Sequence, residues 1–309
     1  MKNYKKYYGF IAGALYGLLF RLLAELNILY FEVFSITFLL IVSSVIALIS
    51  NYFILEHIKY SKLKAFYYPI LTILLFYIFC FITNLEDAIC ILILSIPQLL
   101  IVGVTGLLIN QYVMQKKKVL PVMFVPFLFA PLEDLIPDTH TTYLVEEKIV
   151  IANKPEHIYP NLLDVPLITD KEYTSGIFQT LGIPRPVQSI VEKNEEDYFR
   201  KGYFTEGMIL YESITDYKTN AFVDFSIDIA KSTLRNKPTD QHVLNSNQFT
   251  FDRISYYIVP LDDNTSEVRL QCEYSIASKV NVYANFWAET IIRDFEIRLL
   301  DVLKKKLDK

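Results

Sequence analysis

Four long stretches with almost no charged residues constrain the fold of this chain more than any other feature. Three are free of charge, and the first contains one arginine and one glutamate. They cover Tyr7–Tyr30, Val33–Leu55, Ala65–Leu85 and Ala88–Gln115. About 20 apolar residues in a helix cross the ~30 Å hydrocarbon core of a bilayer, and a helix satisfies its backbone hydrogen bonds internally. The sequence therefore predicts a bundle of four transmembrane helices within residues 1–118.

The charges that flank these stretches alternate in sign along the chain. Lysines lie at the N-terminus, in the second loop and after the fourth stretch, whereas the first and third loops are acidic. The basic residues are Lys2, Lys5, Lys6, Lys59, Lys62, Lys64 and Lys116–Lys118, and the acidic residues are Glu25, Glu32, Glu86 and Asp87. Cytoplasmic loops of membrane proteins are enriched in Lys and Arg. We therefore expect a multi-pass protein of an inner or plasma membrane with both termini in the cytoplasm.

Two positions inside the stretches raise the question of a functional site in the membrane. Arg21 lies at membrane depth, where ionisable residues often mark function. Glu25, one helical turn further on, favours a structural ion pair instead. Pro97 is expected to kink the fourth helix, and Gly103 and Gly106 are expected to allow close helix contacts. So few charges are predicted inside the bundle that a transport pathway has little support.

A proline-rich apolar segment follows the fourth stretch. Val119–Leu132 carries no charge and contains prolines at positions 121, 126 and 131. It is too short to span a bilayer as a regular helix, and its prolines disfavour a continuous helix. We therefore expect residues 119–140 to form a connector that lies in the membrane interface or packs against the bundle.

From Thr141 the hydrophobic pattern changes to the alternation typical of β-strands. Strands are predicted at about 141–151, 187–193, 198–205, 208–216, 221–228, 248–261 and 267–277. The chain then continues as one long predicted helix, Asn281–Leu307. Its expected apolar stripe is Ala284, Trp287, Ala288, Ile291, Phe295, Leu299 and Val302, with Glu296 among the polar residues outside that stripe.

Charge and motif content exclude several functional classes. Residues 141–309 carry 20 basic and 26 acidic side chains, so nucleic acid is not an expected partner. The three cysteines and four histidines form no disulfide framework, metal-binding spacing or catalytic motif. Glycine-rich phosphate loops, HExxH and GxSxG are also absent from the sequence. We therefore assign no catalytic residue, no metal and no cofactor.

The order of elements in residues 141–309 resembles the START-like superfamily, also called SRPBCC or polyketide cyclase/dehydrase-like. Three segments carry the resemblance: "EEKIVIANKPEHIYPNLLDVP", "GMILYESITDYKTNAFVDFSID" and "SEVRLQCEYSIASKVNVYANFWAETIIRDFEIRLLDVL". The resemblance implies an α+β helix-grip domain in which an antiparallel sheet wraps around the long C-terminal helix. It does not extend to the transmembrane region.

This resemblance also implies a cavity between the sheet and the helix that holds an apolar or amphipathic molecule. The residues expected to line it are Phe178, Phe225, Tyr257, Tyr274, Trp287, Ile291 and Phe295. The same side chains would fill the interior if it were solidly packed. The leading hypothesis is a membrane-anchored domain that binds a lipid or another hydrophobic small molecule at the cytoplasmic face of the bilayer, without catalysis.

Two further hypotheses concern the same interior. The aliphatic segment Ile177–Ile183 would act as a gate or touch the membrane. Alternatively, the domain is an enzyme, a cyclase, dehydratase or hydrolase, that acts on an apolar substrate. Catalysis requires at least two polar side chains with perturbed pKa values inside the cavity. Arg185, Glu206 and Glu212 are the candidates for such buried polar groups.

Overall fold

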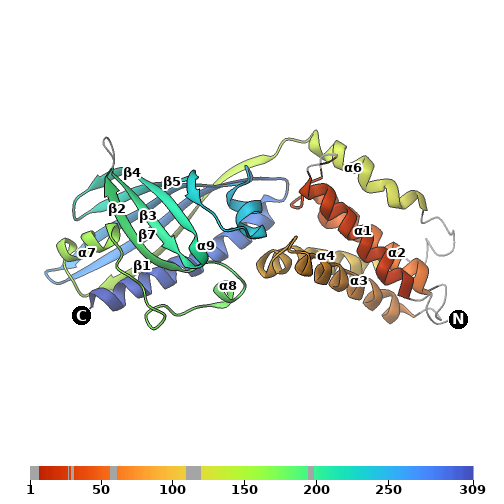
Figure 1. Ribbon diagram of the computed structural model, residues 1–309, viewed down its shortest axis with the longest axis horizontal. Helices are drawn as coiled ribbons and strands as arrows, with labels where there is room; N and C mark the ends of the chain where they lie inside the picture. The colour runs from red at the N-terminus through yellow and green to blue at the C-terminus, as the bar shows by residue number, and fades with distance from the viewer. Residues whose placement is uncertain are drawn as a thin grey trace. The chain divides into compact units, whose positions relative to one another are not determined.

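The chain folds into two compact units (Figure 1). The computed structural model describes residues 7–26, 28, 31–55, 61–108, 120–193 and 198–308. The helical unit comprises Met1–Asp138 and Ser278–Val280. The sheet unit comprises Thr139–Ala277 and Asn281–Lys309. Of the lysines that set the expected membrane orientation, only Lys62 and Lys64 lie within the described residues. Lys2, Lys5, Lys6, Lys59 and Lys116–Lys118 lie outside them.

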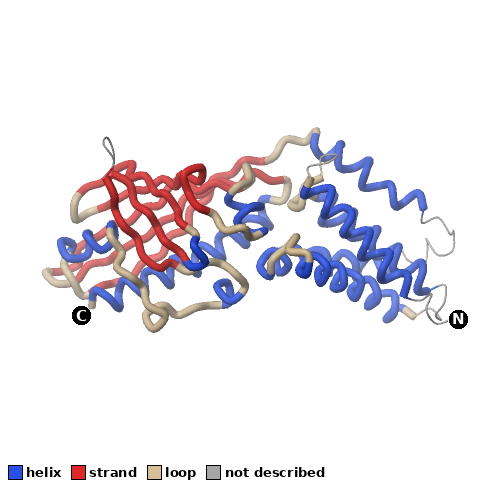
Figure 2. The backbone as a smooth tube through the Cα atoms, viewed as in Figure 1, coloured by secondary structure: helices blue, strands red, loops and turns tan. Residues whose placement is uncertain are grey.

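The helical unit is built from helices and the loops that connect them (Figure 2). Its elements are α1 (Tyr8–Glu25), the π-helix η2 (Thr37–Val42), α2 (Ser43–Leu55), α3 (Lys62–Ile82), α4 (Ala88–Leu108), the 3₁₀-helix η3 (Leu120–Phe124) and α6 (Val125–Asp134). One apolar core joins them, and its largest fully buried side chains include Phe20, Phe38 and Phe76.

Three helices, rather than the expected four, are long and apolar enough to be candidate membrane spans: α1, α3 and α4. The second predicted span is shorter than its charge-free stretch because the helix begins late. The Ser35 hydroxyl accepts a hydrogen bond from the Phe38 amide at 3.0 Å, which is the contact of a helix cap. Residues 33–35 therefore form turns, and the apolar helix covers Thr37–Phe53.

The proline-rich segment is more helical than expected. Pro126 lies in the first turn of α6, where a backbone N–H would have no intrahelical partner. Pro131 lies inside the helix, where it removes one hydrogen bond without ending a helix this short. The Ala130 side chain is buried in the bundle core, and Phe127 packs against that core. The segment is therefore a packed element of the helical unit.

Small and polar side chains bring the candidate spans together. A Cβ atom on Gly103 would lie 2.6 Å from the Phe66 ring, and one on Gly106 would overlap the Ala65 carbonyl. The expected close contacts at these two glycines are therefore confirmed. Pro97 lies inside α4, and the adjacent Gln98 accepts a hydrogen bond from the Tyr77 hydroxyl at 2.7 Å.

Arg21 is fully buried and has more partners than the sequence indicated. Its guanidinium contacts Glu25 at 2.8 Å, as expected, and it also pairs with Glu86 and donates to the Leu85 carbonyl at 2.8 Å. Glu86 lies 65 positions away in the sequence and is equally buried. The arginine thus ties α1 to the loop between α3 and α4.

The sheet unit contains seven strands and one long helix, as the alternating pattern predicted. The strands are β1 (Thr139–Ile151), β2 (Pro186–Lys193), β3 (Tyr198–Phe204), β4 (Ile209–Lys218), β5 (Phe222–Thr233), β6 (Phe249–Asp262) and β7 (Thr265–Ser278). Their order is β1-β7-β6-β5-β4-β3-β2, and the pairs from β2 to β7 are antiparallel. The helix α9 covers Asn281–Leu307, as predicted, and lies against one face of the sheet (Figure 1).

Two apolar clusters lie between the sheet and α9. The larger contains Val223, Phe225, Leu270, Leu299 and Leu303, together with residues of the short helix α7 (Pro155–Leu163). The smaller contains Val145, Cys272, Tyr274, Ile276 and Ile292. A sheet gripping one long helix over such a core is a helix-grip fold, as the resemblance implied.

Candidate functional site

The face of α9 that meets the sheet carries one acidic residue. Glu296 is 2% exposed, and it lies on the same face of α9 as the buried apolar residues Ile292, Leu299, Leu300 and Leu303. Neither carboxyl oxygen of Glu296 has a hydrogen-bond partner among the described residues. Buried polar groups are normally hydrogen-bonded, so an orphaned carboxyl requires an explanation.

Glu296 lies where the two apolar clusters of the sheet unit meet. One turn before it, Ile292 belongs to the smaller cluster, and three residues after it, Leu299 belongs to the larger one. The Glu296 carboxyl interacts electrostatically with two buried residues of the sheet, Tyr256 on β6 and Cys272 on β7. The carboxyl therefore points into the interior and away from solvent.

Burial raises the pKa of the Glu296 carboxyl to about 8. The like charges of Glu147 and Glu146 on β1 contribute to this raised pKa, and the positive charge of Arg293 opposes it. Desolvation disfavours the charged form of a carboxyl, and a neighbouring negative charge acts in the same direction. At neutral pH Glu296 is therefore mainly a neutral acid, which both donates and accepts a hydrogen bond.

A second polar group lies on the same face of the sheet but is fully paired. Arg200 of β3 pairs with Glu212 of β4, directly opposite it in the register, and donates to the Leu162 carbonyl at 2.6 Å. Its guanidinium lies 3.7 Å above the centre of the Phe225 ring. Burial raises the pKa of the nearby Tyr256 to about 12, and the positive charge of Arg200 opposes that shift. We call Arg200, Glu212, Tyr256 and Glu296 the polar belt.

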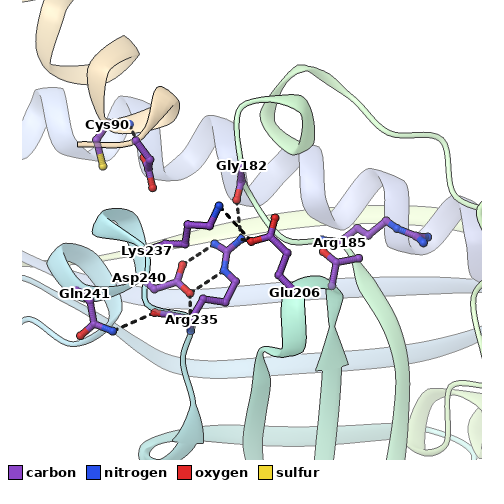
Figure 3. A network of polar contacts seen from close by, with 10 residues as sticks. Cys90, Gly182, Arg185, Glu206, Arg235, Lys237, Asp240 and Gln241 are labelled. Carbon is purple, nitrogen blue, oxygen red and sulfur yellow. Dashed lines mark hydrogen bonds and ion pairs between the residues drawn. The ribbon is translucent and has the colours of Figure 1, made fainter. Parts of the chain in front are cut away.

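A separate network fixes the loops at one end of the sheet (Figure 3). Arg235 donates to both carboxylate oxygens of Asp240, at 2.9 and 2.6 Å, and to the Gly182 carbonyl at 2.9 Å. Glu206 adds a contact to Arg235 at 3.2 Å and one to Lys237 at 3.3 Å. These bonds hold the segment that follows α8 (Ile177–Thr180) against residues 235–240. Each charged side chain of this network is paired within the protein, so we assign the network a structural role.

The seven residues expected to line a cavity differ in burial and in the element on which they lie. Phe225 is buried beneath Arg200, and Tyr274 is buried with its hydroxyl 2.9 Å from Asn285. Phe178 is buried in α8. Phe295 is half-buried, and its ring lies 6.1 Å from that of Phe204.

The other three residues are half-buried. Tyr257 occupies the opposite face of the sheet, where it stacks on Phe222 at 6.0 Å, and its neighbour Tyr256 faces α9 instead. Trp287 is half-buried and packs edge-on against Phe286 at 5.4 Å. Ile291 is half-buried on α9.

Of the three polar candidates named from the sequence, only Glu212 is buried. Arg185 pairs with the exposed Asp170, and the Glu206 side chain is half-exposed. Sequence reasoning missed Arg200, Tyr256 and Glu296. A weak signal for Glu296 existed, because it shares a helical face with Ile292, Leu299, Leu300 and Leu303 at the spacing of three, four and seven residues.

The sequence matches no protein-family model and no curated protein. Several solved structures are similar to about half of this chain. They include the Zhui aromatase/cyclase from Streptomyces sp. R1128, at 10% identity and a TM-score of 0.37, over 54% of this chain and 94% of that one. Norcoclaurine synthase from Thalictrum flavum, in complex with dopamine and hydroxybenzaldehyde, matches at 11% identity and a TM-score of 0.34, over 54% and 87%.

A START superfamily protein from Mycobacterium smegmatis also matches, at 9% identity and a TM-score of 0.37, over 55% of this chain and 98% of that one. The strand order and α9 of this chain define its helix-grip fold.

Proposed function

We propose that the sheet unit binds a mainly apolar small molecule, such as a lipid, that carries a hydrogen-bonding group, and that the helical unit anchors it in a membrane. The observation that carries this proposal is the orphaned carboxyl of Glu296 between two apolar clusters. A buried polar group without a partner costs about 1–3 kcal/mol. A ligand whose polar group bonds to Glu296 would remove that cost, and its apolar part would contact residues such as Phe225 and Phe295.

Membrane anchoring supports the same function. Three helices of the helical unit have the length and composition of membrane spans. A tethered domain meets molecules dissolved in its own bilayer at a high effective concentration. Ligands with low solubility in water are therefore the class that this arrangement would serve best.

The proposal is tested with cis-parinaric acid, a fluorescent fatty acid that accepts energy from tryptophan. Trp287 is the single tryptophan of the chain and lies on α9, so it serves as the donor. We expect saturable energy transfer in the full chain reconstituted in lipid nanodiscs. Losing one buried hydrogen bond should weaken binding about tenfold in Glu296→Leu.

The matched control is Glu289→Leu, which removes a half-exposed glutamate of the same helix that pairs with Arg293. It should bind the probe like the unmodified chain. Energy transfer that fails to saturate, or that is equal in Glu296→Leu and the unmodified chain, would show only partition into the bilayer and would contradict the proposal.

The pKa of Glu296 favours one second candidate function, an enzyme that uses the same interior. A carboxyl with a pKa of about 8 serves as a general acid or base near neutral pH, and Tyr256 is a second perturbed group close by. Catalysis predicts that Glu296→Gln, which cannot exchange its proton, retains a substrate that the unmodified chain converts. Mass spectrometry of the small molecules that co-purify with both proteins would detect this difference. Identical masses in the two samples would argue for binding alone.

A further inference from the structure

The two ends of the helical unit differ in charge. At one end, Glu86 and Glu25 meet at Arg21, close to the C-terminus of α1 and the N-terminus of α4. At the other end, α3 begins at Lys62, and Gly106 near the end of α4 touches Ala65. The helices α1, α3 and α4 therefore run between an acidic end and a basic end of the bundle.

The segment Leu120–Asp134 also runs along the bundle towards the acidic end (Figure 1). It contacts the middle of α1, where the Tyr16 hydroxyl donates to the Met123 carbonyl at 2.7 Å. Further along, the Glu133 carboxylate accepts hydrogen bonds from the amides of Ile36 and Thr37, both at 2.7 Å, at the start of η2. The chain has thus moved about 15 Å along the helix axis between Met123 and Glu133.

The last residues of the helical unit confirm this direction. Asp138 pairs with Lys279 at 3.0 Å, and Lys279 also interacts electrostatically with Glu32 and Glu133. Glu32 belongs to the acidic loop that follows α1. The segment Met1–Asp138 therefore ends at the acidic end of the bundle.

The outer face of this segment has the character of a lipid-facing surface. Leu120–Leu132 carries no charge, and the side chains of Phe124, Leu128, Phe129 and Leu132 are exposed. The inner face buries Pro126 and Ala130. The same division occurs on the candidate spans, where Leu15, Leu19, Leu71 and Leu100 are among the exposed residues. Because the two surfaces belong to one bundle and share this apolar character, the same occupant, lipid, suits both.

We propose that η3 and α6 cross the membrane with the other helices, so that the chain after Asp138 lies on the side of the bilayer opposite to the basic end of the bundle. This placement differs from the cytoplasmic one expected from the sequence. Five residues of 3₁₀-helix and ten of α-helix extend about 25 Å, close to the thickness of the hydrocarbon core. On this proposal the basic end, where Lys62 and Lys64 lie, is the cytoplasmic one, because cytoplasmic loops are enriched in Lys and Arg.

Single cysteines and a membrane-impermeant maleimide test this topology in spheroplasts that express the full chain. Tyr217→Cys marks an exposed position of the sheet unit, and Leu63→Cys marks an exposed position at the basic end. We expect Tyr217→Cys to react in intact spheroplasts and Leu63→Cys to react only after permeabilisation. The native cysteines Cys80, Cys90 and Cys272 are buried, so the unmodified chain gives the background.

A second pair of variants tests α6 itself. Leu128→Cys and Ile136→Cys replace exposed residues within and just beyond α6. We expect Ile136→Cys to react in intact spheroplasts and Leu128→Cys to react only after denaturation in detergent. If Tyr217→Cys reacts only after permeabilisation, or if Leu128→Cys reacts freely from water, the crossing does not exist. Labelling needs no bound ligand, so this outcome is independent of the proposed function.

Discussion

Each of the two units contains a buried arginine that pairs with a carboxylate and donates to a backbone carbonyl, Arg21 in the helical unit and Arg200 in the sheet unit. In the helical unit, Arg21 pairs with Glu25 and Glu86 and donates to the Leu85 carbonyl. In the sheet unit, Arg200 pairs with Glu212 and donates to the Leu162 carbonyl. A buried charge is tolerated when a carboxylate and a carbonyl from other elements surround it.

Glu296 departs from this shared solution. It is as buried as the two arginines, yet its carboxyl oxygens have no partner among the described residues. A carboxyl in this position remains neutral and does not need a counter-charge. Arg21 and Arg200 therefore stabilise the fold through partners within the chain, whereas the partner of Glu296 is expected to come from outside the chain.

The largest effect is expected when a paired charge loses its partner. Arg200→Met keeps the volume of the side chain but leaves Glu212 buried without a positive charge. Breaking a buried pair typically costs 3–5 kcal/mol, so we expect about that loss in the free energy of unfolding. Denaturation of the full chain in detergent, followed by Trp287 fluorescence, measures it in the sheet unit.

The matched control for this variant removes both partners. Arg200→Met combined with Glu212→Leu should recover most of the lost stability, because no unpaired charge remains. A single variant as stable as the unmodified chain would mean that Arg200 and Glu212 contribute nothing as a pair, and the comparison with Arg21 would fail.

Removing the orphaned carboxyl of Glu296 should stabilise the protein, whereas removing Arg200 should destabilise it. Glu296→Leu replaces a desolvated polar group between Ile292 and Leu299 with an apolar one of similar size. We expect the free energy of unfolding to rise by about 1–3 kcal/mol in protein without added ligand. The same denaturation experiment measures it. A loss of stability of that size would show that Glu296 has a partner within the protein, which would remove the basis of the proposed binding site.

The stability of the sheet unit should depend on pH through Glu296. Its carboxyl has a pKa of about 8 in the fold and a usual value of 4.5, so the unfolded chain releases its proton first as pH rises. The free energy of unfolding therefore falls between about pH 4.5 and 8, by at most about 1.4 kcal/mol per pH unit, and this effect ends above the folded pKa. Glu296→Gln should lack this component. Equal slopes in the two proteins would show that Glu296 is ionised in the fold.

Much of the fold was predictable because the periodicity of the sequence determines it. All seven strands and both ends of α9 follow from alternation and from helical spacing. The rotation of α9 was harder to predict. An apolar stripe through Trp287 and Ile291 favours one face, whereas packing selects the face of Ile292, Glu296 and Leu303, and burying a glutamate runs against residue preference.

The inward face of β6 was not predictable from alternation alone. Phe249 and Phe251 pack against the smaller cluster, so strict alternation would place Tyr257 on the same side. A register shift between Phe251 and Arg253 reverses the two faces, and Tyr256 becomes the inward residue. Irregularities of this kind depend on pairing with a neighbouring strand, which a single sequence does not show. Tyr257 was therefore named among the cavity residues in place of Tyr256.

The smallest expected effect concerns a carboxylate that is satisfied by backbone amides. Glu133 accepts hydrogen bonds from Ile36 and Thr37 at the start of η2, so it holds α6 to the bundle. Glu133→Gln keeps one acceptor oxygen but loses the charge that favours a helix N-terminus, which should cost about 0.3–1 kcal/mol. Thermal denaturation of the full chain measures it, and Asp134→Gln, which alters the neighbouring carboxylate, is the control. If Glu133→Gln were stabilising, as Glu296→Leu is expected to be, this carboxylate would also lack an effective partner, and the anchoring of α6 would have to lie in its apolar contacts alone.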